Sequence, residues 1–363
     1  MSEAAIEATE AATAGARITI DLAALVANWR DLGARAPNST CAAVVKADGY
    51  GIGIETVVAA LAKSGCGTFF VALPAEGARA RKAAPQATIY VLNGLFEGAA
   101  PFLADHDLRP VLGSMPEIEE WAAFRAATGA PLPSAIHVDT GMNRLGLSLG
   151  ETAALAADPA LREGAAPALL MSHFACADTP AHPLNAAQIA AFAQARRLLP
   201  DLPGSLANSA GVFLGPDAHH DVLRPGISLY GGAAVVDVAN PMRPVVTLEA
   251  RILMVRDVAP GATVGYGAAW MAPRPSRIAV ISVGYADGFL RAAGSHSGKA
   301  GATAAIEGHL APIVGRVSMD LIAIDVTDVP DRLARRGVFV ELFGANIPID
   351  RAAPAPARSG MNS

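Results

Sequence analysis

Residues 41–46, CAAVVK, are the first of eight short apolar runs that continue to residue 226. The other seven are TFFVAL (68–73), TIYVLN (88–93), RPVLG (109–113), SAIHVD (134–139), ALLMSHF (168–174), GSLAN (204–208) and DVLRPG (221–226). Helical patterns lie between the runs, as at Ile54, Val57, Val58 and Leu61. Continuously apolar strands joined by helices are typical of a parallel sheet that is covered by helices.

Eight strands are the number that closes a (β/α)8 TIM-type barrel. We therefore predict an α/β barrel over residues 17–240, with an open doubly wound sheet as the alternative. The linking segments around 95–107 and 210–220 are short or irregular. After Gly232 the residue pattern changes: strand-like segments follow one another and are separated by turns that contain Gly, Pro and Asp. This pattern predicts a β-rich domain over residues 241–350, which the first strand, 17–21, is expected to join. Residues 1–16 and 351–363 are expected to be disordered.

Composition excludes several classes of protein. The 363 residues are 52% hydrophobic and 17% charged, and 28 Lys and Arg against 33 Asp and Glu give a net charge of −5. The mild acidity argues against a partner such as nucleic acid, which needs a basic face. No run approaches the ~20 apolar residues of a membrane helix, and the first residues, MSEAAIEATEAATAGA, do not resemble a secretion signal. The three cysteines match no metal or disulfide pattern. We expect a cytoplasmic globular protein without a metal.

Polar or titratable side chains stand at the ends of five predicted strands, which is where such a barrel builds its active site. They are Lys46, Asp139, Arg144, His173, Asn208, Ser209 and Arg224. Lys46 is the most informative, because partial burial after the apolar run favours the neutral amine that attacks a carbonyl. The alternative is a strand-end lysine that simply extends into water.

Small residues after the seventh and eighth strands indicate an anion site. Free backbone N–H groups in such loops bind phosphate, although each residue can also serve an ordinary turn. The candidates are Ser209, Ala210, Gly211, Gly226 and Ile227. The glycines at 49, 51 and 53 lack the G-x-G-x-x-G spacing of a dinucleotide site. The adjacent side chains at 219–221, His-His-Asp, lack the spacing of a metal site.

Motifs along the whole chain, taken together, resemble the alanine racemase family of fold-type III pyridoxal-phosphate enzymes. They are AVVKADGYGIG (43–53), HVDTGMNRLG (137–146), SHFACAD (172–178), NSAG (208–211), RPGISLYG (224–231), VGYGAAW (264–270), GYADGF (284–289) and GRVSMD (315–320). The resemblance covers roughly residues 17–350. It implies a barrel with a C-terminal β-rich domain, pyridoxal 5'-phosphate as cofactor, and a head-to-tail homodimer with shared active sites.

The resemblance also implies roles for individual residues. Lys46 carries the cofactor covalently and exchanges the α-proton on the D-alanine side, and Tyr266 of the other subunit is the base on the L-alanine side. Two bases on opposite faces suit a racemase, which removes a proton from one face and returns one to the other. Arg144 and the Met319 N–H hold the substrate carboxylate, while Tyr285 and Asp320 support the neighbouring groups. The other cofactor-binding residues are Tyr50, His173, Asn208, Ser209, Arg224, Gly226 and Ile227.

Two positions depart from the family pattern. Family members often carry a carbamylated lysine where this chain has His137, so that a different group must orient Arg144. The family also carries a C-terminal tyrosine that binds the phosphate, in a segment near A-G-T-x-x-Y-E. The five tyrosines here are Tyr50, Tyr90, Tyr230, Tyr266 and Tyr285, and the chain ends RAAPAPARSGMNS. A truncated or frameshifted terminus would give this pattern, and it would weaken cofactor binding.

We therefore predict an isomerase that interconverts L-alanine and D-alanine for cell-wall peptidoglycan. One alternative is a racemase of broader amino-acid specificity, because the missing tyrosine widens the substrate entrance. The other is a degenerate pyridoxal-phosphate-binding protein whose altered terminus prevents turnover. A decarboxylase of the same fold type is disfavoured by VGYGAAW and GRVSMD.

Overall fold

The computed structural model describes residues 12–129, 131–295 and 299–352. It divides the chain into two compact units, Leu22–Arg243 and Met1–Asp21 with Pro244–Ser363. We call the first the barrel unit and the second the β unit. The division falls after Arg243, whereas the predicted boundary follows residue 240. Most of the two ends predicted to be disordered, 1–16 and 351–363, lies outside the described residues. Within the described part, Ala16 already belongs to a strand and Arg351 to a 3-10 helix, so both predicted ends are slightly too long.

The barrel unit contains a parallel sheet in which each strand is hydrogen-bonded to the next one in the chain. Its strands are β3 (Ala43–Val44), β4 (Thr68–Val71), β5 (Thr88–Val91), β6 (Arg109–Leu112), β7 (Ser134–His137), β8 (Pro167–Met171) and β9 (Gly204–Ser205). The strands are buried along most of their length, which explains why their sequences are continuously apolar. A doubly wound sheet would reverse its strand order at a switch point. The sequential order excludes that alternative.

An eighth strand closes the sheet. β10 (Val222–Leu223) pairs in parallel with β2 (Thr40–Cys41), which directly precedes β3. On the side of β9, the Asp221 N–H donates to the Gly204 carbonyl at 2.9 Å. The predicted eight-stranded, TIM-type barrel is therefore confirmed. The strands where the barrel closes, β2, β9 and β10, are shorter than the corresponding apolar runs.

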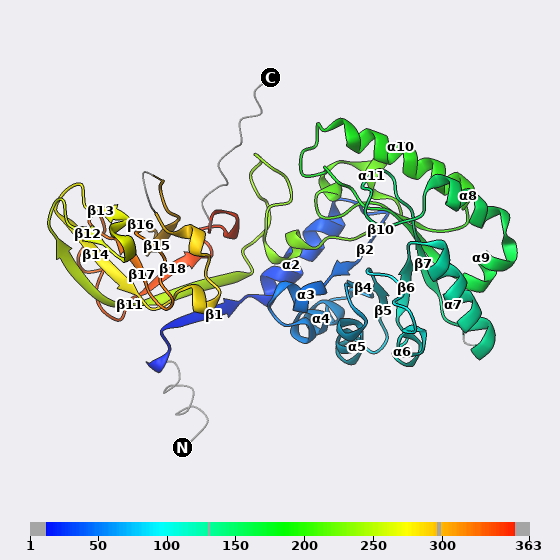
Figure 1. The fold of residues 1–363 in the computed structure, drawn as a ribbon, viewed down its shortest axis with the longest axis horizontal. Coiled ribbons are helices and arrows are strands. Elements are labelled where there is room, and N and C mark those ends of the chain that lie inside the picture. The colour runs from blue at the N-terminus through cyan, green and yellow to red at the C-terminus, as the bar shows by residue number, and fades with distance from the viewer. Residues whose placement is uncertain (1–11, 130, 296–298, 353–363) are drawn as a thin grey trace, which may run out of the picture. The chain divides into compact units, whose positions relative to one another are not determined.

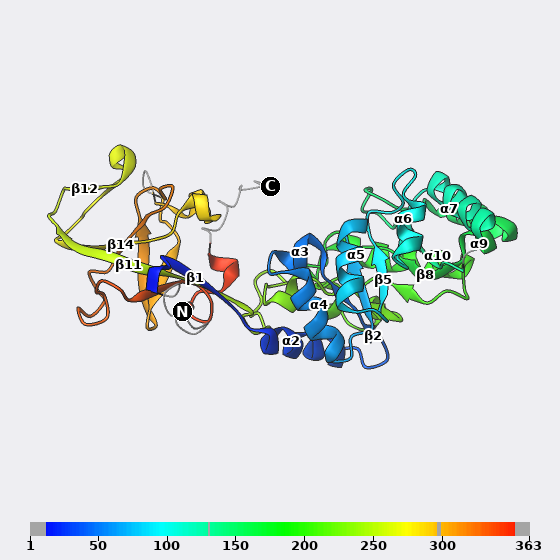
Figure 2. The same cartoon turned by 90° about the horizontal axis from the view of Figure 1, so that it is seen from below.

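Helices surround these strands (Figure 1). They are α2 (Leu22–Ala34), α3 (Lys46–Tyr50), α4 (Ile54–Lys63), α5 (Pro74–Ala83), α6 (Ala100–Asp105), α7 (Met115–Thr128), α8 (Leu149–Ala157), α9 (Pro159–Ala165), α10 (Pro183–Leu198) and α11 (Pro216–His219), with the 3-10 helices η1 (Gly211–Phe213) and η2 (Ile227–Tyr230). The linking segments that are irregular in sequence hold the short helices α6 and α11. Figure 2 shows α3, α4 and α5 next to one another beside the first strands.

The β unit is an antiparallel barrel. Its sheet runs β1-β11-β14-β17-β16-β15-β18, and β11 also pairs with β18, which closes the circle. The strands are β1 (Ala16–Ile20), β11 (Val246–Val258), β14 (Ser276–Ile281), β15 (Thr303–Ile306), β16 (His309–Val314), β17 (Ile322–Asp325) and β18 (Phe339–Phe343), with a separate hairpin of β12 (Thr263–Val264) and β13 (Trp270–Met271). A register shift between Ile252 and Met254 bends the long strand β11 so that it serves two sides of the barrel.

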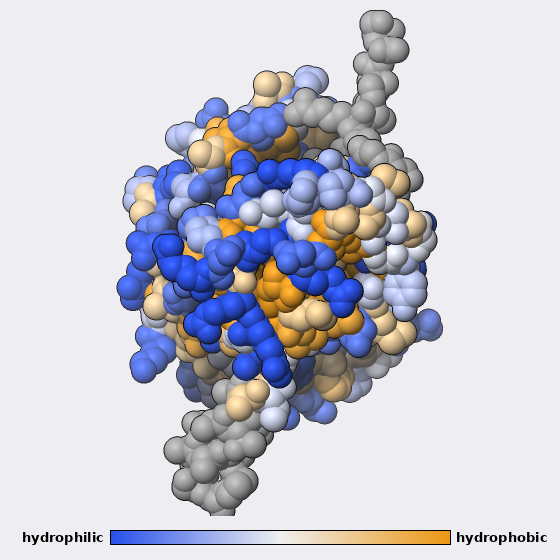
Figure 3. Space-filling view, turned by 90° about the vertical axis from the view of Figure 1, so that its left-hand side faces the viewer, coloured by the Kyte–Doolittle hydropathy of each residue, from blue (hydrophilic) through white to orange (hydrophobic). Residues whose placement is uncertain are grey.

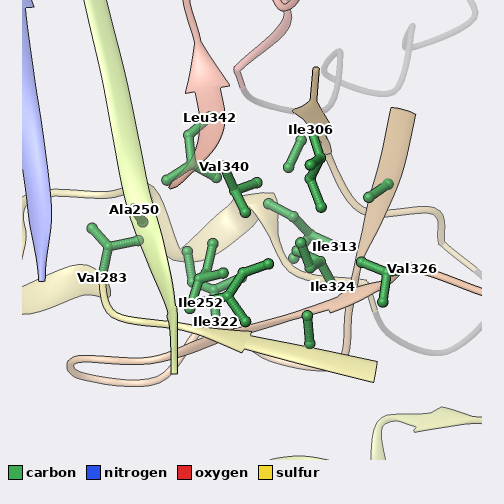
Figure 4. Packing of buried hydrophobic residues seen from close by; sticks show 14 of the residues in the cluster. Ala250, Ile252, Val283, Ile306, Ile313, Ile322, Ile324, Val326, Val340 and Leu342 are labelled. Atoms are coloured by element: carbon green, nitrogen blue, oxygen red, sulfur yellow. The ribbon is translucent and has the colours of Figure 1, made fainter. Parts of the chain in front are cut away.

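Alternating apolar side chains fill the interior of the β unit. Ile252, Ile313, Ile322 and Ile324 come from β11, β16 and β17 and point toward one another (Figure 4). The described connections are turns and the 3-10 helices η3 (Tyr266–Ala268), η4 (Tyr285–Asp287), η5 (Arg291–Ala293) and η6 (Ile349–Arg351). The outer surface carries exposed apolar patches between polar side chains (Figure 3).

Among the described residues, none of the helices is both long enough and apolar enough to cross a membrane.

Candidate active site

A cavity of about 350 Å³ opens in the barrel unit where the strands end, and its size is typical of a pocket for a small ligand or cofactor. Every residue of the predicted cofactor site lines it: Lys46, Tyr50, His173, Asn208, Ser209, Arg224, Gly226 and Ile227. The closed barrel brings these residues together because the loops after β3, β8, β9 and β10 meet at one rim.

The loop that carries Lys46 has an unusual backbone. In α3, φ is 52° at Ala47, 55° at Asp48, 64° at Gly49 and 56° at Tyr50, so the chain makes a left-handed turn directly after β3. This conformation costs roughly 1–2 kcal/mol for each residue that is not glycine. Such strain persists at functional sites when the surroundings hold it in place. Here the turn directs both Lys46 and Tyr50 into the same cavity.

The loops after β9 and β10 form another part of the wall. The Ser209 hydroxyl accepts hydrogen bonds from the N–H groups of Gly226 at 2.8 Å and Ser228 at 3.4 Å, which ties the two loops together. Tyr50 stacks on Tyr230 with 4.4 Å between the ring centres. Burial raises the pKa of Tyr50, so its hydroxyl stays protonated and can donate to an anion. A side chain at Gly226 would collide with this hydroxyl, because an added Cβ would lie 2.2 Å from it.

Arg224 is a buried cation at the floor of the cavity, with 2% of its surface exposed. Its guanidinium donates to the Ser205 hydroxyl and to the Ser172 carbonyl. It also lies 3.4 Å from Nδ1 of His173. Burial, together with the positive charges of Arg224 and Arg144, lowers the pKa of His173 to about 3. The imidazole is therefore neutral at physiological pH, and the fixed positive charge in this cluster belongs to Arg224.

His137 occupies the end of β7 and is almost completely buried. Burial and the nearby charges of Arg224 and Arg144 lower its pKa to about 4, so it too is neutral. Arg144 is exposed and is not a lining residue of the cavity. It lies on a loop that the Asp139 carboxylate holds by accepting three consecutive backbone N–H groups, at residues 141–143. The neutral imidazole offers no negative charge to Arg144, in contrast to a carbamylated lysine.

The pKa values of the two buried histidines predict that the protein loses stability in mild acid. Because both folded-state values lie below the ordinary 6.5, the unfolded chain binds more protons between about pH 4 and 6.5. The free energy of unfolding is therefore highest above pH 6.5 and falls as the pH drops through this window. Between pH 7 and pH 5 the free energy of unfolding decreases, and we expect this decrease to be about 2 kcal/mol smaller in His137→Gln than in the unmodified chain.

Urea denaturation of both proteins at pH 7 and pH 5 measures this difference. His309→Gln is the control, because His309 is exposed on the β unit and its replacement should leave the pH dependence as it is in the unmodified chain. An unchanged pH dependence in His137→Gln would show that His137 is not buried in its neutral form.

The remaining predicted residues lie in the β unit, along the segment 315–320. The N–H of Tyr285 donates to the Ser318 carbonyl at 3.0 Å, and the next N–H donates to the Met319 carbonyl at 2.8 Å. Tyr266 precedes Gly267, where an added Cβ would lie 3.3 Å from the Arg316 guanidinium carbon. Asp320 ends the segment and is exposed. The side chains of Tyr266 and Met319 are 71% and 57% exposed, so they are available to another molecule.

Sequence reasoning missed several residues of the cavity wall. Leu92, Asp178, Ala233 and Ala234 line it, together with Val44. Ala210, a predicted candidate of the anion site, also lines it. Two of the missed residues carried a usable signal, because Leu92 is the last apolar residue of the run 88–93 and Asp178 ends the motif 172–178. Ala233 and Ala234 carry none, because small apolar residues after a glycine pair occur in many loops.

The side chains at 219–221 contact other residues of the barrel unit, and two of them, His220 and Asp221, lie against Arg196. His219 contacts the Val212 carbonyl, His220 contacts Arg196, and Asp221 accepts the N–H of Gly204. No group of three or more potential metal ligands gathers anywhere in the described part of the chain.

Comparison with known proteins identifies the family. The family of alanine racemase N-terminal domains matches residues 20–234, and that of the C-terminal domains matches residues 245–359. The chain belongs to the alanine racemase family. A racemase of Methylobacterium sp. (strain 4-46) is 54% identical over 336 residues, which are 93% of this chain and 91% of that protein. The biosynthetic alanine racemase of Agrobacterium fabrum is 49% identical, over 95% of this chain and 89% of the relative.

Solved structures of the family agree in fold. The alanine racemase of Bartonella henselae, described with covalently bound pyridoxal phosphate, has a TM-score of 0.86 at 39% identity and covers 93% of both chains. The biosynthetic enzyme of Pseudomonas aeruginosa has a TM-score of 0.84 at 38% identity, over 93% of this chain and 92% of that one. The predicted combination of a TIM-type barrel and a C-terminal β-rich domain is the architecture of this racemase family.

Proposed function

We propose that this chain is a pyridoxal-phosphate-dependent isomerase that interconverts L-alanine and D-alanine. One observation carries the proposal: the cavity of the barrel unit unites the Lys46 amine, the buried Arg224 and the donor loops after β9 and β10. Relatives named alanine racemase at about half identity over most of the chain support this activity. The Bartonella henselae structure, with its covalently bound cofactor, supports the choice of pyridoxal phosphate.

The residues of the cavity fit that cofactor. Lys46 provides an amine for a carbonyl group. The loops at Ser209 and Gly226, with the hydroxyl of Tyr50, provide donors for a phosphate. Glycine at 226 leaves space for the Tyr50 hydroxyl. Arg224 provides a charged donor for the pyridine nitrogen, and His173 and Asn208 complete the wall. When bound, pyridoxal phosphate supplies an electron sink that acidifies the α-proton of the substrate.

Arg224 would set the strength of that electron sink. Its guanidinium remains charged at neutral pH and can only donate, so it would keep a pyridine nitrogen placed against it unprotonated. Ser205 and Ser172 hold the guanidinium in position. An unprotonated pyridine withdraws fewer electrons, which restrains side reactions such as transamination.

The proton transfers would use two bases on opposite faces of the substrate. The Lys46 amine would remove or return the α-proton on the D-alanine side, and the Tyr266 phenol would do so on the L-alanine side. Arg144 and the Met319 N–H would hold the carboxylate of the substrate. Tyr285 and Asp320 would support this half of the site.

We further propose a cytoplasmic homodimer in which the β unit of one subunit completes the cavity of the other. The segment 315–320 supports this arrangement, because it gathers Tyr266, Tyr285 and Met319 at exposed positions. Analytical ultracentrifugation tests the dimer. A monomer with full racemase activity would contradict it.

Gly226→Ala is expected to weaken cofactor binding by about 10- to 100-fold, as overpacking typically does. The new Cβ would displace the hydroxyl of Tyr50, and the stacked Tyr230 leaves that ring little freedom to move. Titration of the apoprotein with pyridoxal phosphate, followed by absorbance, measures the affinity. The matched control is Gly67→Ala, where an added Cβ meets nothing within 4 Å. Equal affinities for the two variants would remove Gly226 from the proposed phosphate site.

The activity itself is tested by incubating the purified protein with L-alanine and excess pyridoxal phosphate and separating the products by chiral chromatography. Formation of D-alanine supports the proposal. Absence of D-alanine from protein that binds the cofactor would contradict it and favour the degenerate alternative. Parallel reactions with L-serine and larger L-amino acids test the broader-specificity alternative, which a strict preference for alanine would exclude.

A further inference from the structure

We propose that Glu76, a residue outside the cavity, is a positioning residue for Lys46 and Tyr50. Its carboxylate holds the left-handed turn of α3 in the conformation that directs both side chains into the cavity. This inference rests on the proposed function only in assigning those two side chains to the cofactor.

Glu76 joins two neighbouring loops of the barrel rim. It is the third residue of α5, and its Oε2 accepts the N–H groups of Ala72 and Leu73 at 2.9 and 3.1 Å, which caps its own helix. Its Oε1 accepts the N–H of Asp48 at 3.2 Å, in the middle of the left-handed turn. A capping glutamate needs one oxygen for its helix. The second oxygen therefore connects the turn that carries Lys46 to α5.

Helix α5 also holds the turn through a second contact. Arg79 of α5 pairs with Asp48 Oδ1 at 2.7 Å, and that oxygen also accepts the N–H of Ile54 at the start of α4. The turn is thus fastened to both α4 and α5, which lie beside it in Figures 1 and 2. These contacts act on the residue where the backbone is strained. Without them the turn is free to relax toward right-handed geometry and to move Lys46 and Tyr50 away from their positions.

The barrel contains a matched contact elsewhere on its rim. Glu117 is the third residue of α7, and its Oε2 accepts the N–H of Gly113 in its own loop at 2.8 Å. Its Oε1 accepts the N–H of Leu95, in the loop after β5, at 3.0 Å. The arrangement is similar to that at Glu76, although Oε2 of Glu117 accepts the Ser114 hydroxyl in place of a second N–H. Neither the loop at 94–98 nor the one at 113–114 contributes a lining residue to the cavity.

Comparison of Glu76→Gln with Glu117→Gln therefore separates positioning from general support of the rim. In each variant the glutamine amide has a single oxygen, and we expect that oxygen to keep its hydrogen bonds to the helix cap. The NH₂ group then faces the N–H of the neighbouring loop, from which it cannot accept a hydrogen bond. Glu76→Gln thus loses the bond to Asp48, and Glu117→Gln loses the equivalent bond to Leu95. We expect Glu76→Gln to bind pyridoxal phosphate about tenfold more weakly and to lower kcat by a similar factor. KM for alanine should stay unchanged, because Arg144 lies on a different loop.

Hydrogen exchange of the apoprotein gives a readout independent of activity. Exchange should become faster at residues 47–53 in Glu76→Gln and at residues 94–98 in Glu117→Gln. The proposal is supported when faster exchange at 47–53 is accompanied by weaker cofactor binding in Glu76→Gln alone. It is overturned when both variants lose the same affinity, or when Glu76→Gln binds the cofactor like the unmodified chain although residues 47–53 exchange faster.

A second pair of variants covers the case in which Glu76→Gln does not fold. Arg79→Gln removes the ion pair with Asp48, whereas Glu55→Gln removes the other carboxylate partner of Arg79 and leaves that pair intact. Weaker cofactor binding in Arg79→Gln alone supports the proposal, and equal binding in the two variants overturns it. The unmodified chain must form D-alanine in the same series. If it forms none, the proposed function fails, while the comparison of affinities and exchange still decides the role of Glu76.

Discussion

Replacement of Lys46 with alanine is expected to abolish D-alanine formation and covalent attachment of pyridoxal phosphate. The amine is the nucleophile for the cofactor and also the base on the D-alanine side, so one substitution removes two functions. A decrease in kcat/KM of at least about 10⁴-fold follows, because each function alone is worth about two to four orders of magnitude. The fold should survive, since Lys46 is only half-buried and lies just after the end of β3.

Two measurements check this result. D-alanine is quantified by chiral chromatography, and borohydride reduction followed by intact mass spectrometry detects the covalently bound cofactor. Lys63→Ala is the control, because Lys63 is an exposed lysine near the end of α4. Turnover in Lys46→Ala, or a cofactor adduct of undiminished amount, would remove Lys46 from the mechanism.

Replacement of Tyr266 with phenylalanine is expected to remove one of the two bases and to leave the other. Exchange of the α-proton of L-alanine with solvent should fall by about 10²- to 10⁴-fold. Exchange from D-alanine, which depends on Lys46, should change much less. Net racemisation must slow equally in both directions, because the equilibrium constant between enantiomers is one and no substitution can alter it. Proton exchange, and not the net rate, is therefore the informative quantity.

Incorporation of deuterium from D₂O into each enantiomer, followed by NMR, measures the two exchange rates separately. The rate for D-alanine serves as the internal control for folding and cofactor binding. Equal decreases for both enantiomers would refute the assignment of one base to each face. Because Tyr266 is largely exposed on the β unit, its substitution should have little effect on the free energy of unfolding.

The fold could be predicted from the sequence because a parallel barrel requires apolar strands and helices to alternate along the chain. Each strand is buried on both faces, so runs such as 68–73 and 88–93 are apolar over most of their length, and their number is the closure number of a barrel. The short strands β2, β9 and β10 were found as parts of longer apolar runs, and their true bounds were not. A run marks burial, whereas the bounds of a strand depend on hydrogen bonds to neighbours that are distant in the chain.

Most residues of the cavity could be predicted from the sequence for a related reason. Residues at the ends of parallel strands gather at one rim, so Lys46, His173 and Arg224 were expected together before any distance was known. Their protonation states were not predictable from the sequence. The low pKa values of His137 and His173 arise from burial and from two arginines brought near by the fold. Ala233 and Ala234 were missed because nothing local distinguishes a small residue that lines a cavity from one that lies beside it.

The sequence by itself determined the alternation of strands and helices, the number of strands and the chemical groups at their ends, because these depend on patterns within short segments. The order of the strands depends on pairing between distant segments, so only the tertiary structure excluded a doubly wound sheet. The tertiary structure alone decided how those groups are held. A left-handed turn over residues 47–50 opposes the local preference of Ala47 and Tyr50, so their propensities do not indicate it. It exists because Glu76 and Arg79 of α5 and the start of α4 bind its middle residue, and contacts between separate segments form only when the chain has folded.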